Sequence, residues 1–551
     1  MRPFPLRFTP SLLIWTLAFL LPRPADAARQ LVGATDGVKR VHLLYTNDIH
    51  GFLSPREASF MNPDFPPGLG GAPALTKYIA DVRAQAAADG EGVLLLDGGD
   101  IFQGTRVGER TRGRAITDWM KAVGYDAMVL GNHDFDLGWD LTKQIAETSS
   151  FPVLAANVAP EGSQDPVYWA PPYTVVEKEG VRFGIVGLVT RDTEGLTGAD
   201  QIAGLDFLPI DETMRRYMTE LEVHDVDVVM ALGHLGVPPD WSSRMDQLDR
   251  VVATPPEERQ QGLNAQDLAR AVPGIHVIVG GHIHWGLREP YEDPITHTLC
   301  VQTYGKLSGV GHIILLIDEE TQTLAGYELA HAEGSEVTLF SDYNWPDPAQ
   351  RDSIGAKVAI AEAGMDEVLA NLEVNLPRGT AEHALGQVVT DAFLAAAEAD
   401  VAFTNRGGIR TELRRGPITS RHLFEVLPFN NELVTYDVDG TQLMEMLETG
   451  VRGGRRDLQL AGARITVDRS REDGDKITAA TVAGAAVDPN ARYRVVTTSY
   501  LASGAIGWDL LPKLSETPVG LTDLDALINY FSANSPLQHD FEPRIHRIGG
   551  S

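Results

Sequence analysis

Residues 41–50, Val41-His-Leu-Leu-Tyr-Thr-Asn-Asp-Ile-His50, join an apolar run to two side chains that commonly bind metals. The run Val41–Tyr45 is typical of a buried β-strand, and Asp48 and His50 follow it closely. Four later apolar runs end in the same way. They are followed by Gly98-Gly99-Asp100, Gly131-Asn132-His133-Asp134, Gly233-His234 and Gly280-Gly281-His282-Ile283-His284. In the first two-thirds of the chain, each of these predicted strands is thus followed directly by a cluster of polar residues.

The fold class follows from what lies between these clusters. Strands are expected at Val41–Tyr45, Val93–Leu96, Met128–Leu130, Val226–Leu232 and His276–Val279. Between the first two, Leu75, Ile79, Val82 and Ala86 recur at helical spacing. Alternating strands and helices predict a layered α/β fold. In such folds ligands bind beyond the carboxyl ends of the strands, where all five clusters lie.

A break rich in Pro and Asp at residues 342–348 divides the chain. We expect a metal-binding α/β domain over residues 38–345 and a linker helix over residues 346–372. A smaller mixed α/β domain, expected to bind the substrate, should occupy residues 373–551. Its predicted strands are Val401–Thr404, Glu432–Val438 and Tyr493–Thr498.

Residues 1–27 have the pattern of a secretory signal peptide. Arg2 and Arg7 precede the apolar segment 11–21, and Ala25-Asp26-Ala27 fits the cleavage rule. A segment this short does not span a bilayer, which takes about 20 residues. We therefore expect a periplasmic or secreted protein without stable membrane association after cleavage, as a monomer or weak oligomer.

The 551-residue chain has a formal net charge of −30 and one cysteine, Cys300. A surface this acidic disfavours duplex nucleic acid as a partner, because such binding needs a basic face. Small phosphate esters remain possible substrates, since salt screens surface repulsion beyond about 10 Å and bound cations reverse the local charge. Cys300 lies in an apolar stretch and is expected to be a buried small hydrophobe.

The polar clusters supply ligands for divalent cations. Aspartate oxygen and histidine nitrogen suit zinc, manganese and cobalt. Asp48 and His50 are two residues apart and can turn to one ion, and the carboxylate of Asp100 can bridge two. Asn132, His234, His282 and His284 complete the candidate set. A single Gly-His or Gly-Asp pair is more often a turn with a satisfied polar group, but five in order at strand ends indicate a dinuclear metal site.

The order D-x-H, G-D, G-N-H-D, G-H, G-G-H-x-H resembles the signature of the calcineurin-like metallophosphoesterases. The resemblance implies that Asp48, His50, Asp100 and His284 hold one ion. It implies that Asp100, Asn132, His234 and His282 hold the other. His133 would then act on the transition state or the leaving oxygen, oriented by Asp136, whereas Asp134 is expected to cap a helix that begins there.

The second domain resembles the C-terminal domain of secreted bacterial 5′-nucleotidases. The motifs that carry this resemblance are Asn405-Arg-Gly-Gly-Ile-Arg410, Ala384–Ala392, Leu427-Pro-Phe-Asn430 and Tyr500-Leu-Ala-Ser-Gly504. It implies phosphate contacts from Arg378, Asn405, Arg406 and Arg410. Phe429 and Tyr500 would stack on the base. The alternative, that both aromatic rings are core residues, remains open.

Two positions depart from this family. Gln387 replaces the usual asparagine of its Leu-Gly-Asn motif. Ile506 stands where the family has an aspartate that binds ribose hydroxyls, and isoleucine accepts no hydrogen bond. The resemblance implies hydrolysis of phosphate esters, foremost 5′-nucleotides, by a metal-bound hydroxide. Alternatives on the same site are a phosphodiesterase, a nucleotide-sugar hydrolase or a non-nucleoside phosphomonoesterase. A non-catalytic binding protein is disfavoured, because mere binding needs neither His133 nor Asp136.

Overall fold

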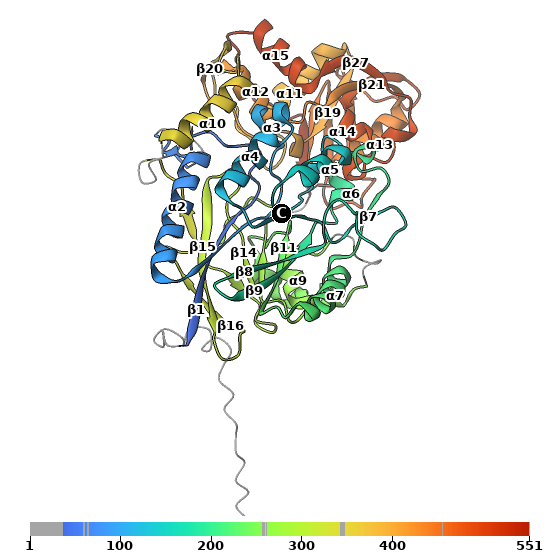
Figure 1. The fold of residues 1–551 in the computed structure, drawn as a ribbon. Coiled ribbons are helices and arrows are strands. Elements are labelled where there is room, and N and C mark those ends of the chain that lie inside the picture. Colours follow the sequence, from blue (N-terminus) through green and yellow to red (C-terminus); the bar gives the residue numbers. More distant parts are fainter. Residues whose placement is uncertain are drawn as a thin grey trace, which may run out of the picture.

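The computed structural model describes residues 37–58, 61–62, 65–255, 259, 262–341, 348–453 and 456–549. The expected signal peptide, residues 1–27, lies outside the described residues, as does most of the predicted break at 342–348. No helix within these ranges is long and apolar enough to cross a membrane. The N-terminal domain, coloured blue to green in Figure 1, packs against a C-terminal domain coloured orange to red.

The first sheet of the N-terminal domain carries three of the polar clusters. Its strand order is β16-β15-β1-β4-β5-β6, with β17 paired to β15. The strands are β1 (Val38–Thr46), β4 (Gly92–Asp97), β5 (Ala127–Val129), β6 (Val153–Leu154), β15 (Gly309–Asp318), β16 (Leu324–Leu329) and β17 (Glu336–Thr338). β1, β4, β5 and β6 run parallel, so their carboxyl ends share one edge.

The second sheet carries the other two clusters and has the order β13-β14-β12-β11-β9-β8. Its strands are β8 (Tyr173–Lys178), β9 (Val181–Leu188), β11 (Val228–Gly233), β12 (Val277–Val279), β13 (Tyr291–Glu292) and β14 (Leu299–Val301). β9, β11, β12 and β14 are parallel. The short pairs are β2 (Arg56–Glu57) with β3 (Gly68–Leu69) and β7 (Val158–Pro160) with β10 (Leu205–Phe207).

The two sheets pack face to face between two layers of helices. Along β11, Val228 and Met230 join the core shared with the first sheet, whereas Ala231 faces the other core. This period of two is what an internal strand covered on both sides requires. One side carries α2 (Gly71–Asp89), α3 (Arg106–Thr111), α4 (Arg114–Val123) and α5 (Trp139–Thr148). The other carries α7 (Ile210–Leu221), α8 (Met245–Ala253) and α9 (Ala265–Ala271), whereas α6 (Thr193–Leu196) contacts residues 505–507 of the C-terminal domain. Cys300 is buried among α7 and α9, as expected.

The C-terminal domain is built on a five-stranded sheet, β22-β19-β26-β21-β27. These strands are β19 (Val401–Asn405), β21 (Glu432–Asp439), β22 (Leu458–Ala461), β26 (Arg492–Thr498) and β27 (Thr517–Thr522). One face packs against α11 (Ala384–Ala397), α12 (Ser420–Val426) and α15 (Asp523–Ala533). The other packs against α13 (Gly440–Gly450), α14 (Ser499–Ala502) and a second sheet of β23 (Ala463–Asp468), β24 (Ile477–Val482), β25 (Ala485–Ala486) and β28 (Ile545–Ile548). The predicted layered α/β and mixed α/β architectures are confirmed.

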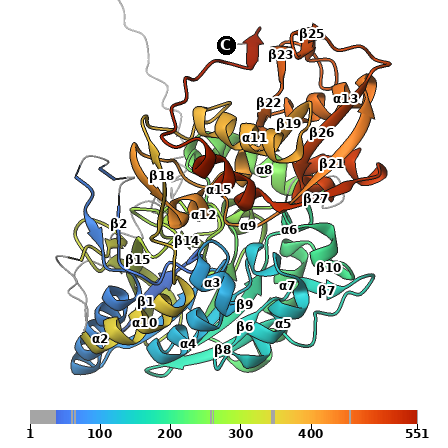
Figure 2. The ribbon, with the colours of Figure 1, turned by 90° about the horizontal axis from the view of Figure 1, so that it is seen from above.

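The predicted linker helix over 346–372 is wrong in its second half. Helix α10 spans Pro348–Ala361, and the chain then passes Gly364, whose φ of +83° belongs to the left-handed region. Val368–Leu372 forms strand β18, which pairs with β20 (Gly416–Thr419) of the C-terminal domain. Ala370 and Leu372 are buried and Asn371 between them is exposed, an alternation that suits a strand. Helix α10 contacts α2 and α3 of the N-terminal domain (Figure 2).

Packing between β1 and β15 gives a stability prediction. Tyr45 is fully buried opposite Gly311, and a Cβ at Gly311 would lie 1.9 Å from the tyrosine ring. Gly311→Ala should therefore lower the free energy of unfolding by about 1–3 kcal/mol or more, because the core has no room to expand. Gly355→Ala is the control, since it lies within α10 with no neighbouring atom within 4 Å. It should be neutral or stabilising by ~0.5–1 kcal/mol, and equal urea midpoints for the two variants would contradict the prediction.

Candidate metal centre and interdomain cleft

The five polar clusters meet where the carboxyl ends of the two sheets face each other. The loops after β1 and β4 run side by side, with Asp48 N donating to Gly99 O at 2.8 Å and His50 N to Asp100 O at 2.9 Å. Gly99 has a φ of +89°, and a Cβ there would lie 2.7 Å from the Gly131 nitrogen. Glycine is therefore required for the β4 and β5 loops to approach this closely.

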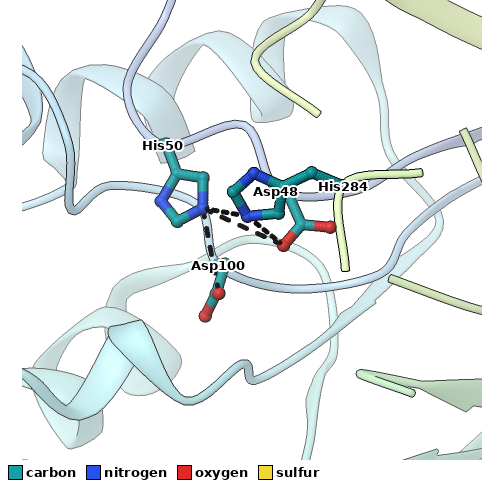
Figure 3. A group of neighbouring side chains, drawn as sticks. All are labelled: Asp48, His50, Asp100 and His284. Atoms are coloured by element: carbon teal, nitrogen blue, oxygen red, sulfur yellow. Dashed lines mark hydrogen bonds and ion pairs between the residues drawn. The ribbon is translucent and has the colours of Figure 1, made fainter. Parts of the chain in front are cut away.

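One group of candidate ligands comprises Asp48, His50, Asp100 and His284 (Figure 3), whose ligand atoms all lie within 4.8 Å of one another. The Nε2 atoms of His50 and His284 are 2.9 Å apart. His284 Nε2 lies 3.2 Å from Asp48 Oδ1, and His50 Nε2 lies 3.9 Å from Asp100 Oδ2. Residues from three separate loops thus direct nitrogen and oxygen atoms at one point.

A second group shares Asp100 with the first. Asp100, His234 and His282 have ligand atoms within 4.8 Å of one another. His234 Nε2 lies 3.1 Å from Asp100 Oδ2 and 3.2 Å from Asn132 Oδ1. The structure therefore brings together all seven candidate metal ligands, with Asp100 between the two groups as a bridging ligand would be.

The chemistry of this donor set fits divalent cations. Asp48 Oδ1 and Asp100 Oδ2 are buried, and no described residue donates a hydrogen bond to either. His50 Nδ1 contacts Gln103 O at 2.5 Å and His234 Nδ1 contacts Gly98 O at 2.6 Å. Because a carbonyl only accepts, each Nδ1 carries a proton, and each Nε2 is the nitrogen turned toward the other candidate ligands. Burial, followed by the positive field of His284, holds the pKa of His50 well below its usual range, which favours its neutral form.

The ligand loops hold a strained backbone. Asp48, His50, Asp100, His282 and His284 have φ between +50° and +74°, the left-handed region that non-glycine residues seldom occupy. Such conformations persist only when surrounding contacts enforce them, and they concentrate at functional sites. Neighbouring backbone bonds supply that enforcement here, so the ligands are held in position by the fold.

Asn47 supports the ligand Asp48 from behind, a role that the sequence pattern did not reveal. Asn47 Nδ2 donates to Asp48 Oδ2 at 2.6 Å and to Thr303 O at 3.0 Å, and its Oδ1 accepts from Thr303 N at 2.9 Å. One amide therefore ties the β1 loop to the loop after β14 and fixes the carboxylate. The remaining Asp48 oxygen is the one that faces His284.

Asn47→Ala should weaken metal binding about 10–100-fold, the usual cost of removing such a supporting hydrogen bond. Titration of the metal-free protein with Mn²⁺ or Zn²⁺ measures this directly. Asn534→Ala, at an exposed site after α15, is the control and should bind metal normally. Unchanged affinity in Asn47→Ala would show that Asp48 is held by other contacts.

Asp134 does not cap a helix, which corrects the expectation from sequence. Its carboxylate is buried and accepts from three backbone groups: Asp100 N at 3.1 Å, Ile101 N at 3.0 Å and Gly131 N at 2.8 Å. Two of these donors lie in the β4 loop, more than thirty residues earlier in the chain. Asp134 therefore joins two ligand loops, and only the folded structure shows this.

His133 and Asp136 form a hydrogen-bonded pair beside the metal ligands. His133 Nδ1 lies 2.6 Å from Asp136 Oδ2, and His133 N donates to Asp100 Oδ1 at 2.7 Å. Burial opposes the charged imidazolium, but the carboxylates of Asp136 and Asp100 outweigh it and raise the pKa of His133. A proton on Nε2 is thus available for a neighbouring group. The Phe429 ring of the C-terminal domain stacks on His133, with centroids 5.4 Å apart.

A cavity of about 260 Å³ opens beside His133 and is lined by both domains. Of the predicted site residues, it is lined by Asn132, His133, Asp136, Asn405, Arg410, Phe429 and Tyr500. Ile506 also lines it, with a left-handed φ of +51°. Residues that the sequence did not single out include Gln103, Asp200, Asn431 and Asp523. Both aromatic rings therefore border the cavity, with Tyr500 also packed partly against the domain core.

Two predicted phosphate ligands do not line this cavity. Arg378 Nε donates to Ile409 O at 2.6 Å, and Arg406 Nε lies 3.6 Å from the Asp457 carboxylate. Burial and the nearby Arg406 and Arg410 lower the pKa of Arg378 to about 10. Among the described arginines of this group only Arg410 reaches the cavity, where its guanidinium lies 5.5 Å from the Phe429 ring centroid.

Comparison with known families gives a match for each of the two domains that line the cavity. Residues 41–286 match the calcineurin-like phosphoesterase family, and residues 368–513 match the 5′-nucleotidase, C-terminal domain family. The chain is a metallophosphoesterase of the 5′-nucleotidase family. The metallophosphoesterase motifs identified from sequence lie in the first match, and the Asn405–Arg410 loop lies in the second.

Similar proteins span nearly the whole metallophosphoesterase. A 5′-nucleotidase of Vibrio cholerae is 26% identical over 551 residues, covering 91% of this chain and 92% of that protein. Protein UshA of Yersinia enterocolitica is 26% identical, covering 92% and 93%. The crystal structure of a 5′-nucleotidase precursor from Thermus thermophilus matches with a TM-score of 0.78 at 28% identity, covering 93% of this chain and 100% of that one.

Proposed function

We propose that this metallophosphoesterase hydrolyses nucleoside 5′-monophosphates to nucleoside and phosphate with two divalent ions, zinc, manganese or cobalt. The observation that carries this proposal is the cavity, which is lined by Asn132 and His133 of one domain and by Tyr500 and Ile506 of the other. A phosphate ester placed in it would have its phosphoryl group beside the metal ligands and its alcohol against the C-terminal domain. The names of the similar proteins support a nucleotide as that ester.

Different residues around the cavity would have different roles in the reaction. Asp48, His50, Asp100 and His284 would hold one ion, and Asp100, Asn132, His234 and His282 the other. Bound divalent ions would lower the pKa of water and neutralise charge on the transferred phosphoryl group. Arg410, with Asn405 beside it, would contact the phosphate. His133, oriented by Asp136, would donate its Nε2 proton to the departing alcohol oxygen. Arg378 and Arg406 would act on phosphate only through Arg410 or after a rearrangement.

Domain boundaries and location are part of the same proposal. We assign residues 38–345 to the metallophosphoesterase domain and, given strand β18, begin the substrate-binding domain near residue 368 rather than 373. The signal-like pattern of residues 1–27 supports a periplasmic or secreted protein. The net charge of −30 supports a small-molecule partner over duplex nucleic acid.

Phosphate release by the protein loaded with Mn²⁺ or Zn²⁺ tests the proposal, with 5′-AMP compared against glycerol phosphate. We expect kcat/KM to favour AMP by about a hundredfold, which is roughly 2.7 kcal/mol of transition-state discrimination. Equal values would overturn nucleotide specificity while leaving the phosphatase chemistry intact. Bis(p-nitrophenyl) phosphate then tests the second candidate, an enzyme for diesters without a nucleoside, which Ile506 in the lining favours because it offers no acceptor to ribose hydroxyls.

A further inference from the structure

The lining of the cavity includes a buried carboxylate that the proposed chemistry does not use. Asp523, the first residue of α15, is only 1% exposed yet borders the cavity. Asp136 is engaged with His133, which leaves Asp200 and Asp523 as the other carboxylates of the lining. A buried charge is costly unless its partners are well placed, so the contacts of Asp523 are informative.

Those contacts fix the neighbouring amide of Asn431. Asp523 Oδ1 accepts from Leu524 N at 2.8 Å, and Oδ2 accepts from Asn431 Nδ2 at 2.9 Å. A third bond, from Asp523 N to Asn431 O at 2.8 Å, holds the two backbones together. An ionised carboxylate only accepts hydrogen bonds, so Asn431 must turn its NH₂ toward Asp523. Its carbonyl oxygen is then left for the cavity that Asn431 also borders.

The orientation of this amide matters because of the residue at position 506. Ile506 offers no acceptor to a substrate in this cavity. A nucleoside presents hydrogen-bond donors, namely its ribose hydroxyls and the exocyclic amine of adenine, cytosine or guanine. A donor buried without a partner loses affinity, so such a substrate needs an acceptor in the cavity. Asn431 lines the cavity, and the bond from its Nδ2 to Asp523 leaves its side-chain oxygen as a candidate acceptor.

We propose that Asp523 is a positioning residue that fixes the Asn431 amide with its oxygen toward the cavity, so that the nucleoside end selects substrates by a hydrogen-bond donor. This inference rests on the proposed function and names the chemistry that distinguishes one nucleotide from another. The donor is either the base amine or a ribose hydroxyl, and the two sources are separable with substrate pairs. AMP against purine riboside 5′-monophosphate, which carries hydrogen in place of the amine, isolates the amine, and AMP against 2′-deoxy-AMP isolates a hydroxyl.

Asp523→Asn is the most specific test because it replaces the hydrogen-bond acceptor that faces Asn431 by a donor without changing the shape of the side chain. The new side chain keeps an oxygen for Leu524 N and must then present its NH₂ to Asn431. Asn431 responds by turning its own oxygen toward residue 523, which puts its NH₂ into the cavity. We expect wild-type kcat/KM to favour AMP by about tenfold over the analogue lacking the donor. In Asp523→Asn that ratio should fall to one or below, chiefly through KM.

Two controls separate positioning from damage to the fold. Asp525→Asn removes the same charge from the same helix turn, but Asp525 is exposed and bonds Thr522 instead. It should leave all ratios unchanged. Glycerol phosphate measures the metal centre alone, and kcat/KM on it should stay within about twofold in Asp523→Asn. Should that variant fold poorly, Asn431→Ala should also abolish the AMP preference while retaining activity on glycerol phosphate.

Burial raises the pKa of Asp523 to about 7, so the measurements are made above that pH, where the carboxylate is ionised. They decide between distinct outcomes. A collapse of either ratio in Asp523→Asn alone supports the proposal and identifies the donor. Unchanged ratios or a parallel loss on glycerol phosphate would overturn it. Asp200 is the other carboxylate of the lining, and a collapse of the ratios in Asp200→Asn alone would also overturn it. If the wild type does not prefer AMP to glycerol phosphate, the proposed nucleotidase function fails and the inference fails with it.

Discussion

His133→Ala is expected to retain its metal ions and lose about 10²–10⁴-fold in kcat on AMP, the usual contribution of a general acid. The His133 ring belongs to neither group of metal ligands, so metal content measured by elemental analysis should not change. The alkoxide of ribose needs a proton to depart, whereas p-nitrophenolate does not. The loss on p-nitrophenyl phosphate should therefore be much smaller than the loss on AMP.

Asp136→Asn provides the matched variant for that experiment. It keeps the hydrogen-bonding shape beside His133 Nδ1 but removes the negative charge that raises the His133 pKa. We expect a smaller loss than in His133→Ala, and an acidic shift of the basic limb of the pH–rate profile. Equal losses of His133→Ala on both substrates would mean that His133 acts on the phosphoryl charge or on packing against Phe429 instead of protonating the leaving oxygen.

Asp100→Asn is expected to reduce binding at both metal positions, with affinities at least about 10²-fold weaker, because a ligand that both share costs more than a supporting residue. The amide has only one acceptor, and His133 N already donates to Asp100 Oδ1 at 2.7 Å. The other position would carry an NH₂, which cannot bind a cation. Asparagine also tolerates the φ of +60° at this residue, so backbone strain does not complicate the result.

His282→Ala and His284→Ala are the comparisons for Asp100→Asn, since each removes a ligand from one group only. Each should lose one equivalent of tightly bound metal, measured by elemental analysis after dialysis, while Asp100→Asn loses both. Retention of a full equivalent in Asp100→Asn would show that the two positions do not depend on a shared carboxylate.

Short-range sequence patterns predicted the strands well, and the residues proposed from them as metal ligands lie together in the structure. The run before Asp48 forms β1, and the runs before Asp100 and Asn132 form β4 and β5, because apolar strands and their flanking turns are encoded locally. Parallel strands then bring their carboxyl ends together, which is why residues far apart in the chain were expected to meet. The linker helix was predicted too long because, over a short stretch, the apolar residues before Leu372 fit both the helical and the strand periodicity.

The roles that sequence missed all depend on partners distant in the chain. Asn47 binds the backbone of Thr303, and Asp134 binds the loop after β4. Asp523 meets Asn431 only because α15 begins beside the end of a loop ninety-two residues earlier. A polar residue shows its type in the sequence but not its partner. For the same reason Arg378 and Arg406 were expected at the phosphate, whereas they contact Ile409 and Asp457, outside the cavity lining.

The position of the cavity between the two domains bears on how mutations could change the substrate specificity of this enzyme. The groups that would perform the chemistry and those that would choose the substrate stand on separate hydrophobic cores. Substitutions at Asn431, Ile506 or Asp523 are expected to alter the choice of substrate without disturbing the fold around Asp100. A mutant library confined to the C-terminal lining should therefore yield new specificities at little cost in metal binding, whereas one spread over the ligand loops should yield mostly inactive proteins.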